Sequence, residues 1–599
     1  MNNLERIRHS ASHVMAEAVL SLFPDAKVAI GPAIDDGFYY DFDFGRTLVP
    51  EDLEAIEAKM KTLLKKDSPF VTKDVSLDEA RKLFANQPYK LELIEDLAAK
   101  SEGAPKLSVY TQGGFTDLCR GPHVASTAEI PAEGVKLLNI AGAYWRGDSD
   151  KAMLQRIYGT VWQNKADLDA YLHRIEEAKK RDHRTLGKQL ELFTTSEEVG
   201  GGLILWQPNG GMVRYVAERF SKEAHRLNGY NFVYSPHIGK ANLWETSGHL
   251  DFYRESMYSP MQIDDNQYYI KPMNCPFHMH IYKARPRSYR ELPLRMAEFG
   301  TVYRYETSGS LHGLTRVRGF TQDDAHIFCR PEQIDGEISK ALDFSLYILR
   351  SFGLKDFTAY ISTRPKEKSI GIDEDWSRAT KALEKAVEKA DLPYKYDVGG
   401  GAFYGPKIDL KLNDAIGREW QLSTIQFDFN LPERFNLAYV SEDGSPQRPL
   451  MVHRALFGSV ERFMGMLTEH YAGAFPFWLS PVQTAIVPIT DDVLPYSRQV
   501  EEALADEGIR VEVDDRNERM QAKIRDAQLR KIPVIAVIGR KEAEAGMVSV
   551  RDRDAGDKGQ MPLADFIKMA KEADAVGTPR RMDKKGSASS PFVGNKLAM

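Results

Sequence analysis

Cysteine is scarce in this sequence, with three residues among 599. Three thiols cannot form the disulfide framework of a secreted domain, so we expect a reducing, cytoplasmic location. Long apolar runs are also missing, and charges interrupt the N-terminal segment, which excludes a signal peptide and a membrane span. The net charge is only −6, so a nucleic-acid partner would have to meet local basic patches.

The remaining composition is that of an ordinary globular protein, with 42% apolar and 28% charged residues. A chain of this length is too long for one hydrophobic core and predicts about three or four domains.

The most informative segment, residues 304–329, reads RYETSGSLHGLTRVRGFTQDDAHIFC. We predict a strand that places Arg304 and Glu306 on one face, a turn, and a second strand from Arg316. Residues on one face of the second strand would be Arg316, Arg318, Phe320, Gln322, Asp324, His326 and Phe328. Those on the other, packing face would be Val317, Gly319, Thr321, Ala325 and Ile327. Arginines suit an anionic ligand and a carboxylate suits an amine. The alternative is a solvated edge hairpin, which the interleaved phenylalanines and flanking glycines disfavour.

A histidine pair and a cysteine–histidine pair in the first part of the chain each have a spacing of four residues. Residues 2–23 predict a helix, on which His9 and His13 lie four apart and share a face. Cys119 and His123 are also four apart. Together these residues could supply four zinc ligands. The alternative is two surface histidines and an unrelated thiol.

A strand, a turn and a helix are predicted for residues 448–471, RPLMVHRALFGSVERFMGMLTEHY. His453 would end the strand, Gly458 and Ser459 would form the turn, and Arg462 would lie in the first helical turns. A helix N-terminus with an arginine suits a phosphate group. Cys275, His326 and His453 are too far apart in sequence for spacing alone to indicate a metal site.

Several of these segments resemble one family. Arg304-x-Glu306 followed by a loop and Arg316 is similar to motif 2 of the class II aminoacyl-tRNA synthetases, and GSLHGLTRVRGFTQDDAHIF is similar to its threonyl-tRNA synthetase form. Residues 448–471 resemble motif 3, and residues 201–238 resemble motif 1, which builds the dimer interface. The resemblance extends to about residue 575. Phe277 departs from it, because family members commonly have glycine there.

The resemblance implies an α+β and α/β multidomain fold. The expected parts are an N-terminal α+β editing domain at 1–164, a connector helix at 165–192, a class II catalytic domain on an antiparallel sheet at 193–476, and an α/β anticodon-binding domain at 477–576. The tail at 577–599 is rich in Gly, Ser, Pro and charge and is expected to be disordered. Many bacterial relatives carry a further small domain before the editing domain. The chain starts directly on the editing helix, so that domain is either naturally absent or truncated.

The implied activity is that of a threonine–tRNA ligase acting as a homodimer. It would activate L-threonine with ATP and magnesium, transfer it to threonine tRNA, and hydrolyse mischarged seryl-tRNA at a separate editing site. One zinc ion per subunit would be held by Cys275, His326 and His453, leaving a coordination position open. A site that binds the threonine hydroxyl can reject valine by roughly 10⁴-fold or more, whereas serine lacks only a methyl group worth ~1–3 kcal/mol. A second, hydrolytic site is therefore expected.

The resemblance also implies roles for individual residues. Around ATP it implies Arg304 at the α-phosphate, Glu306 on the adenine side, Phe320 stacked on adenine, and Arg316 and Arg462 at the γ-phosphate. Around threonine it implies Gln322, Asp324, Tyr404, Gln421 and Gln426 with Lys407 beside them, and His249 as the base for transfer to tRNA. In the editing pocket it implies His9, His13, Lys90, Asp117, Cys119 and His123, where the histidines and the cysteine would order water and substrate. At the anticodon it implies Asn517, Arg525, Lys531, Glu542 and Arg551, although an arginine is common at position 531.

Two alternatives remain open from the sequence. A class II enzyme for another amino acid, such as proline or serine, is disfavoured by the three zinc positions and by the His9/His13 and Cys119/His123 pairs. A non-enzymatic relative that only binds RNA is disfavoured by the presence of Arg304 and Arg462.

Overall fold

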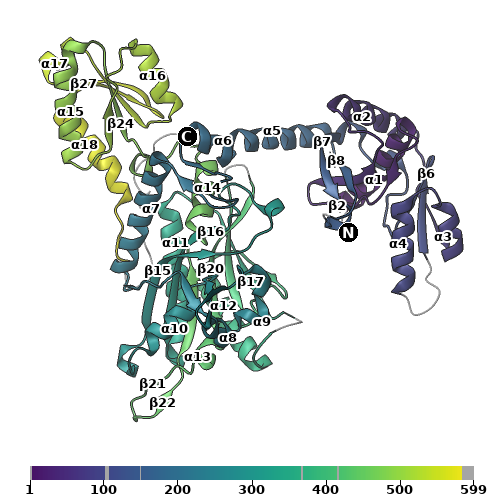
Figure 1. Cartoon of the computed structure of the whole chain (residues 1–599). Coiled ribbons are helices and arrows are strands. Elements are labelled where there is room, and N and C mark those ends of the chain that lie inside the picture. The colour runs from purple at the N-terminus through teal and green to yellow at the C-terminus, as the bar shows by residue number, and fades with distance from the viewer. Residues whose placement is uncertain (1–2, 101–106, 149, 366–368, 415–416, 583–599) are drawn as a thin grey trace. The chain divides into compact units, whose positions relative to one another are not determined.

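The computed structural model describes residues 3–100, 107–148, 150–365, 369–414 and 417–582. The chain divides into two compact units, Met1–Glu176 and Glu177–Met599, and helix α5 (Lys165–Arg181) contains the point of division (Figure 1). In the described parts of the chain, no helix combines the length and apolar character that a membrane span requires.

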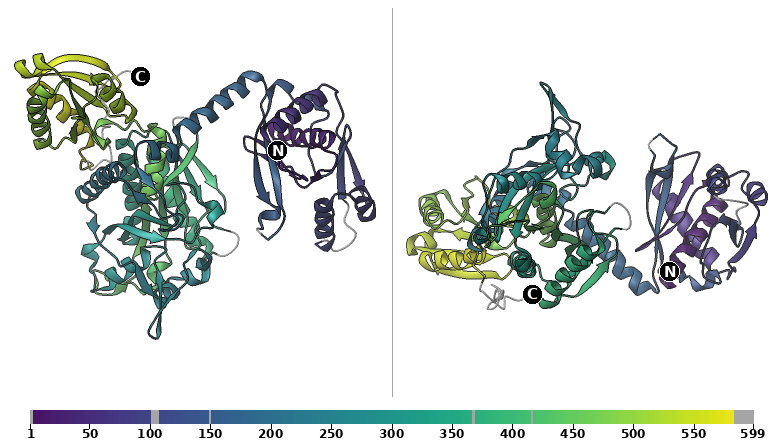
Figure 2. Two further views of the ribbon diagram at one scale, coloured as in Figure 1. Left: turned by 45° about the horizontal axis from the view of Figure 1, so that its top comes forward. Right: turned by 90° about the horizontal axis from the view of Figure 1, so that it is seen from below.

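The first unit is built from two antiparallel sheets with helices packed on them. Helix α1 packs against β3 and β8, because Ala11, Val14 and Ala18 recur on one buried face (Figure 2). The larger sheet has the order β1-β3-β8-β7 with β2 beside β3, and the smaller one has the order β4-β5-β6. The elements are α1 Asn3–Leu22, β1 Lys27–Val28, β2 Ala33–Ile34, β3 Gly37–Asp43, α2 Pro50–Leu64, β4 Val71–Val75, α3 Leu77–Leu83, α4 Pro88–Ala99, β5 Leu107–Gln112, β6 Phe115–Leu118, β7 Val135–Tyr144 and β8 Met153–Val161.

The second unit is organised on an 8-stranded sheet of order β11-β15-β16-β23-β20-β19-β17-β18. The outermost strand on each side runs parallel to its neighbour, and the pairs between them are antiparallel. This sheet confirms the class of fold expected for the catalytic region. Its strands are β11 Asn231–Phe232, β15 Leu294–Tyr303, β16 Gly319–Cys329, β17 Phe357–Ser362, β18 Tyr394–Asp397, β19 Lys407–Asn413, β20 Glu419–Asp428 and β23 Leu450–Ala455.

Helices and short strands surround this sheet. They are α6 His183–Gln189, β9 Phe193–Thr194, β10 Leu205–Trp206, α7 Pro208–Leu227, β12 Ile238–Lys240, α8 Ala241–Ser247, α9 His249–Phe252, β13 Met261–Ile263, β14 Asn266–Ile270, α10 Cys275–Lys283, α11 Ile334–Ser351, α12 Asp373–Lys389, α13 Leu431–Arg434, β21 Tyr439–Val440, β22 Pro446–Gln447 and α14 Val460–His470.

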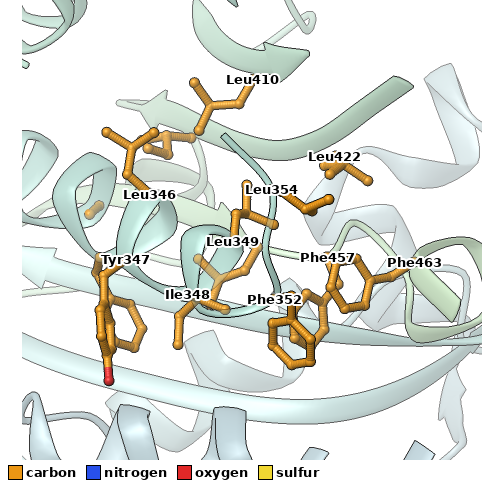
Figure 3. Close-up of a cluster of buried hydrophobic side chains, with 14 of the residues drawn as sticks. Leu346, Tyr347, Ile348, Leu349, Phe352, Leu354, Leu410, Leu422, Phe457 and Phe463 are labelled. Atoms are coloured by element: carbon orange, nitrogen blue, oxygen red, sulfur yellow. The ribbon is translucent and has the colours of Figure 1, made fainter. Parts of the chain in front are cut away.

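The core of this unit fixes helix α14 against the sheet. Figure 3 shows side chains of α11, β19 and β20 converging on the segment that leads into α14. Phe457 and Phe463 stack with their ring centroids 4.0 Å apart, and Phe352 meets Phe463 edge-on at 5.0 Å. Buried aromatic pairs of this kind add roughly 0.5–1.5 kcal/mol beyond their burial. The start of α14, where Arg462 lies, is therefore rigidly placed.

The α/β pattern predicted after residue 477 is present. Its sheet has the order β25-β24-β26-β27-β28, parallel through the first three strands and antiparallel beyond them. Strand β28 was not predicted, because GDKGQMP has none of the branched or aromatic residues typical of strands. The elements are β24 Thr484–Pro488, α15 Leu494–Asp506, β25 Val511–Val513, α16 Met520–Leu529, β26 Val534–Ile538, α17 Arg540–Ala545, β27 Met547–Asp552, β28 Gly556–Pro562 and α18 Leu563–Asp574.

The segment after α18 returns to the catalytic sheet's helices. The backbone N–H of Arg580 donates to the Tyr347 hydroxyl on α11 at 2.7 Å, and that of Met582 donates to Oδ1 of Asn228, at the end of α7, at 2.9 Å. Val576 and Met582 also pack on the large core. Disorder was expected from residue 577, but residues 577–582 are ordered by these contacts. The remainder of the expected tail, 583–599, lies outside the described residues.

Candidate active site

The strand register places three predicted residues in a row across the catalytic sheet. His326 on β16 lies opposite His453 on β23, which in turn lies opposite Gln426 on β20. Cys275, the first residue of α10, faces them, and the donor atoms of Cys275, His326 and His453 lie within 4.8 Å of one another. The structure thus brings together three residues whose sequence spacing could not show a site. His453 lies within its strand, which ends two residues later than predicted, at Ala455.

The hydrogen bonds around these two histidines assign their tautomers. His453 Nε2 lies 2.8 Å from a carboxylate oxygen of Asp428, so Nε2 carries the proton and Nδ1 the lone pair. His278 Nε2 lies 3.0 Å from Glu298, so its Nδ1 accepts the proton of His326 Nδ1 at 2.7 Å. The lone pairs of His326 Nε2 and His453 Nδ1 then face each other at 2.9 Å. Two such lone pairs repel each other unless a cation lies between them, so the donor set fits a metal ion.

Further predicted residues line the same end of the sheet. Asp324 lies two residues before His326 on β16 and accepts a hydrogen bond from Asn274 at 3.2 Å. The Tyr404 hydroxyl donates to Gln426 Oε1 at 2.8 Å. Lys407 lies opposite Gln426 in the strand register. An acid, a phenol and an amide therefore surround the proposed metal ligands, a set that can bind the polar groups of an amino acid.

Gln421 is not brought to this group. It lies on β20 opposite Lys411, five residues before Gln426. That separation is roughly 17 Å along an extended strand.

The expected alternation of the second strand applies to only part of it. The strand begins at Gly319, whereas Arg316 and Arg318 lie in the preceding loop. There the backbone N–H of Arg316 donates to the His312 carbonyl at 3.3 Å, and the Arg316 carbonyl accepts the His312 N–H at 3.0 Å. From there Gln322 and Asp324 are partly open to solvent, while Thr321 and Ala325 are buried as predicted.

Asp323 is a buried acid that the sequence reading missed. It lies on the packing face of β16 and accepts backbone N–H groups of Leu456 and Phe457 at 3.0–3.2 Å. Burial raises its pKa to about 7. The signal was the first acid of the Asp323–Asp324 pair, which strict alternation places inside the protein. Its bonds fix the turn that leads into α14.

The residues predicted for ATP lie on two elements. In the loop between β15 and β16, the guanidinium of Arg304 packs over the Phe320 ring at 5.1 Å from its centroid, and over Tyr253 at 5.6 Å. Arg316 Nε pairs with a carboxylate oxygen of Glu306 at 3.0 Å. The aromatic rings hold one arginine in place, and the ion pair closes the base of the loop.

Arg462 lies on the second element, helix α14. Ser459 caps this helix by accepting the Arg462 backbone N–H at 3.0 Å, as the predicted turn and helix start require. Within the described chain, the buried Nε of Arg462 has no hydrogen-bond partner, and burial lowers its pKa. A water molecule or an anionic ligand would satisfy this N–H, and an anion would also match the charge of the guanidinium.

His249 is buried beside this site. Its Nδ1 contacts the Ser247 hydroxyl at 2.7 Å and its Nε2 contacts the Met273 sulfur at 3.0 Å. Burial, assisted by the nearby charge of Arg304, lowers its pKa to about 3. The imidazole is therefore neutral at physiological pH and a weak base, because an efficient catalytic base has a pKa near the working pH.

The predicted editing residues meet in the first unit. Cys119 Sγ lies 3.4 Å from His9 Nε2 and 3.3 Å from His123 Nε2, and the rings of His9 and His123 stack at 4.2 Å. The donor atoms of His9, His13, Cys119 and His123 lie within 4.8 Å of one another. Burial raises the pKa of the Cys119 thiol to about 11 and lowers that of His123 to about 2. Such neutral donors and acceptors can order water.

A buried ion pair completes this pocket. Lys90 contacts Asp117, and both side chains are almost completely buried. Asp117 also accepts the Tyr40 hydroxyl at 2.7 Å and lies 3.6 Å from His13 Nε2. Tyr40 was not predicted as a site residue. The second missed residue is Ser10, whose hydroxyl contacts His123 Nδ1 at 3.1 Å from the same helix as His9.

The predicted anticodon residues are spread over the C-terminal α/β domain. Asn517 follows β25, Arg525 lies on α16, and Lys531 follows that helix with a φ of 59°. Glu542 begins α17 and accepts the Ser549 hydroxyl at 2.9 Å, while Arg551 lies two residues beyond Ser549 on β27. Except for Glu542 they are exposed, and in the described part of the domain they do not form one hydrogen-bonded cluster. Scattered exposed side chains are suited to an extended RNA loop.

Three protein families match parts of the chain. Residues 107–158 match the threonyl and alanyl tRNA synthetase second additional domain, residues 258–471 match the tRNA synthetase class II core domain (G, H, P, S and T), and residues 483–573 match an anticodon binding domain.

Whole-length relatives and solved structures agree with these matches. A threonine–tRNA ligase of Dehalococcoides mccartyi is 56% identical over 569 residues, which are 95% of this chain and 96% of the relative. One from Magnetococcus marinus is 54% identical over 574 residues, or 96% and 88% of the two chains. The crystal structure of the RNA binding domain of threonyl-tRNA synthetase from Cryptosporidium parvum superposes with a TM-score of 0.63 at 41% identity, covering 65% of this chain and 98% of that one.

Proposed function

The chain belongs to the threonine–tRNA ligase family of class II synthetases, and on this premise we propose how its residues divide the work. It is an enzyme that activates threonine with ATP and transfers it to tRNA, and it carries the editing domain that removes mischarged serine. Threonine, ATP and tRNA are its substrates, and magnesium accompanies ATP.

Zinc is proposed as the metal of the Cys275–His326–His453 site. The observation that carries the proposal is the pair of imidazole lone pairs facing each other beside a cysteine. One thiolate and two imidazoles are typical zinc ligands, and three of them leave a position for substrate. A bound zinc ion supplies a Lewis acid for the amino and hydroxyl groups of threonine. Valine lacks the hydroxyl and would leave that position unsatisfied.

The residues around the metal are proposed to orient threonine. Asp324 lies two residues before His326 on β16 and can accept the amino group, while Tyr404 and Gln426 form a hydrogen-bonded pair beside His453. We propose supporting positions for Gln322 and Lys407 at the same end of the sheet. Gln421 lies too far along β20 to share this pocket, so we do not include it among the threonine-binding residues.

ATP is proposed to bind between the loop after β15 and the start of α14. Arg304, Glu306 and Arg316 would meet it from the loop, Phe320 from the start of β16, and the unpartnered Nε of Arg462 would meet its γ-phosphate end from the helix. Cationic groups fixed in advance stabilise the charge that moves during adenylate formation. Because its pKa is so low, we propose His249 as a neutral hydrogen-bond acceptor beside Arg304 and not as a strong base.

The remaining proposals concern the domains and the assembly. We propose that the editing, catalytic and anticodon-binding domains occupy 1–164, 193–476 and 477–576, joined by the connector at 165–192. The anticodon would be read by Asn517, Arg525, Lys531, Glu542 and Arg551. A homodimer is supported by exposed apolar side chains on and near α7, namely Leu205, Met212, Tyr215, Tyr234 and Ile238.

Threonine-dependent ATP–pyrophosphate exchange, compared across all twenty amino acids, tests the synthetic function. We expect threonine to give the fastest exchange, serine an appreciable rate and valine only background. Hydrolysis of pre-formed seryl-tRNA tests the editing site: a protein carrying both His9→Ala and His13→Ala should lose it and keep normal exchange. Fastest exchange with another amino acid would overturn the proposed specificity, and unchanged hydrolysis would overturn the editing assignment.

A further inference from the structure

A buried histidine outside these sites joins the two elements proposed to bind ATP. His183 is the first residue of α6 and is fully buried. Its Nδ1 lies 2.6 Å from Oε1 of Glu469 on α14. Its Nε2 accepts the backbone N–H of Leu314 at 3.0 Å, and Leu314 lies in the loop between β15 and β16. One imidazole therefore connects the loop of Arg316 to the helix of Arg462.

Asp182, His183 and Glu469 have the residue types of a metal site, but their hydrogen bonds leave no free lone pair on the imidazole. Donor atoms of Asp182, His183 and Glu469 lie within 4.8 Å of one another. Both ring nitrogens of His183 are already engaged, since Nδ1–H donates to the carboxylate and Nε2 accepts an amide N–H. Asp182 caps α6 by accepting the Arg184 backbone N–H at 2.8 Å. With no ring lone pair left for an ion, the cluster is a link between elements.

Two glycines show how closely the three elements approach. Gly313 has a φ of 49°, and a Cβ there would lie 2.2 Å from His183 Nε2. On α14, a Cβ at Gly465 would lie 3.2 Å from Leu314 Cβ and 3.6 Å from the His183 ring. Larger residues at 313 would strain the backbone and displace the imidazole. The loop, α6 and α14 are therefore in close van der Waals contact around the His183 ring.

The carboxylate at the centre of the link is itself fixed. Glu469 is almost completely buried, also accepts the His183 backbone N–H at 3.1 Å, and pairs with Arg418 from the turn between β19 and β20. It follows Arg462 by seven residues, which is nearly two helical turns, so both side chains leave the same side of α14. Movement at Glu469 would therefore be transmitted to Arg462 along a rigid helix.

We infer that His183 is a positioning residue for ATP, holding the motif 2 loop and the motif 3 helix in one register so that their arginines reach the same triphosphate. The inference rests on the proposed ATP roles of Arg316 and Arg462. His183 does not touch the substrate itself. It acts through the two hydrogen bonds of its ring, which hold the middle of a loop whose two ends are fixed by β15 and β16.

Steady-state exchange with the full-length protein tests this inference. His183→Phe fills the same space without either hydrogen bond, and His183→Gln offers an amide oxygen to Leu314 in place of Nε2. We expect His183→Phe to raise the KM for ATP about tenfold or more, since displacements near 1 Å can cost up to ~10²-fold in rate. His183→Gln should recover part of that loss. The KM for threonine and the hydrolysis of seryl-tRNA should stay unchanged in both.

The possible failures are distinguishable. An unchanged KM for ATP in His183→Phe, or an equal rise in the KM values for ATP and threonine, would overturn the inference and leave the proposed function intact. Loss of threonine-dependent exchange in the unmodified protein would overturn the proposed function and the inference together. If His183→Phe does not fold, Gly313→Ala takes its place in the test. The substitution lies in the loop, and its added Cβ would push the His183 imidazole away from Leu314. A normal KM for ATP in Gly313→Ala would likewise overturn the inference.

Discussion

Removing the buried charge of Lys90 should destabilise the editing pocket far more than removing an exposed lysine nearby. Lys90 and Asp117 are 2% and 3% exposed, and in Lys90→Met the carboxylate keeps the Tyr40 hydroxyl but loses its cation. Breaking a buried pair by deleting one partner costs about 3–5 kcal/mol. Lys136→Met is the matched control, because the Lys136 side chain is 43% exposed and its partner Glu57 keeps a second cation, Lys61, at 2.7 Å, so no carboxylate is left without a cation.

Amide hydrogen exchange of the β5 and β6 peptides measures this effect locally, which a whole-chain melting temperature of a multidomain protein cannot do. A loss of 3 kcal/mol corresponds to about 100-fold faster exchange from opened states. Hydrolysis of seryl-tRNA should fall, while threonine activation should not change. The double variant Lys90→Met with Asp117→Asn should exchange more slowly than the single one, since no unpaired charge remains. Exchange in Lys90→Met that matches Lys136→Met would refute the reasoning.

Three further outcomes are expected. Cys275→Ala should abolish both zinc content and threonine activation, because the thiol is one of three proposed ligands; full zinc by metal analysis with normal exchange would remove that assignment. Arg551→Ala should weaken charging of threonine tRNA by about 1–3 kcal/mol and spare activation without tRNA; equal losses in both assays would speak against a base contact. Burial, with His13 and His9 nearby, lowers the folded-state pKa of His123 to about 2, below the ~6.5 of an unfolded chain. The contribution of neutral His123 to the free energy of unfolding is therefore fully present above pH 6.5. It is lost as pH falls, by at most about 1.4 kcal/mol per pH unit. Intrinsic-rate-corrected exchange of the α1 peptides should show this decline between pH 6.5 and 5. His123→Gln should make the slope shallower without removing it, because burial also lowers the pKa values of His9 and His13. An unchanged slope in that variant would contradict the pKa.

Local patterns predicted local structure well. The turn at Gly458 and Ser459, the helix that follows and the placement of Arg462 all rest on neighbouring residues, and the structure has them as expected. The position of His326 opposite His453 depends on strand register across 127 residues of sequence, which no spacing shows, and only the family resemblance supplied it. Neither the local pattern nor the family resemblance pointed to His278, because its hydrogen bond to the His326 ring is visible only in the structure.

The errors have similar causes. The second strand was predicted from Arg316 because alternation continues there, but the His312–Arg316 bridge holds that residue in the turn and delays the strand to Gly319. Asp323 was not predicted as a buried acid. Its backbone partners, Leu456 and Phe457, lie more than a hundred residues later in the sequence. Such partners are invisible to any local pattern.

The return of residues 577–582 to α7 and α11 gives the anticodon-binding domain a second attachment. A domain held by one linker can swivel about that linker, whereas one anchored where the chain enters and again where it leaves has lost that freedom. The Arg580 N–H makes this second attachment on α11, and the Met582 N–H makes it at the end of α7, within the segment that resembles motif 1. A fusion or deletion placed before Met582 would remove the second attachment and let the anticodon-binding domain rotate about its remaining linker. The orientation of bound tRNA would then change although every residue that contacts the tRNA is intact.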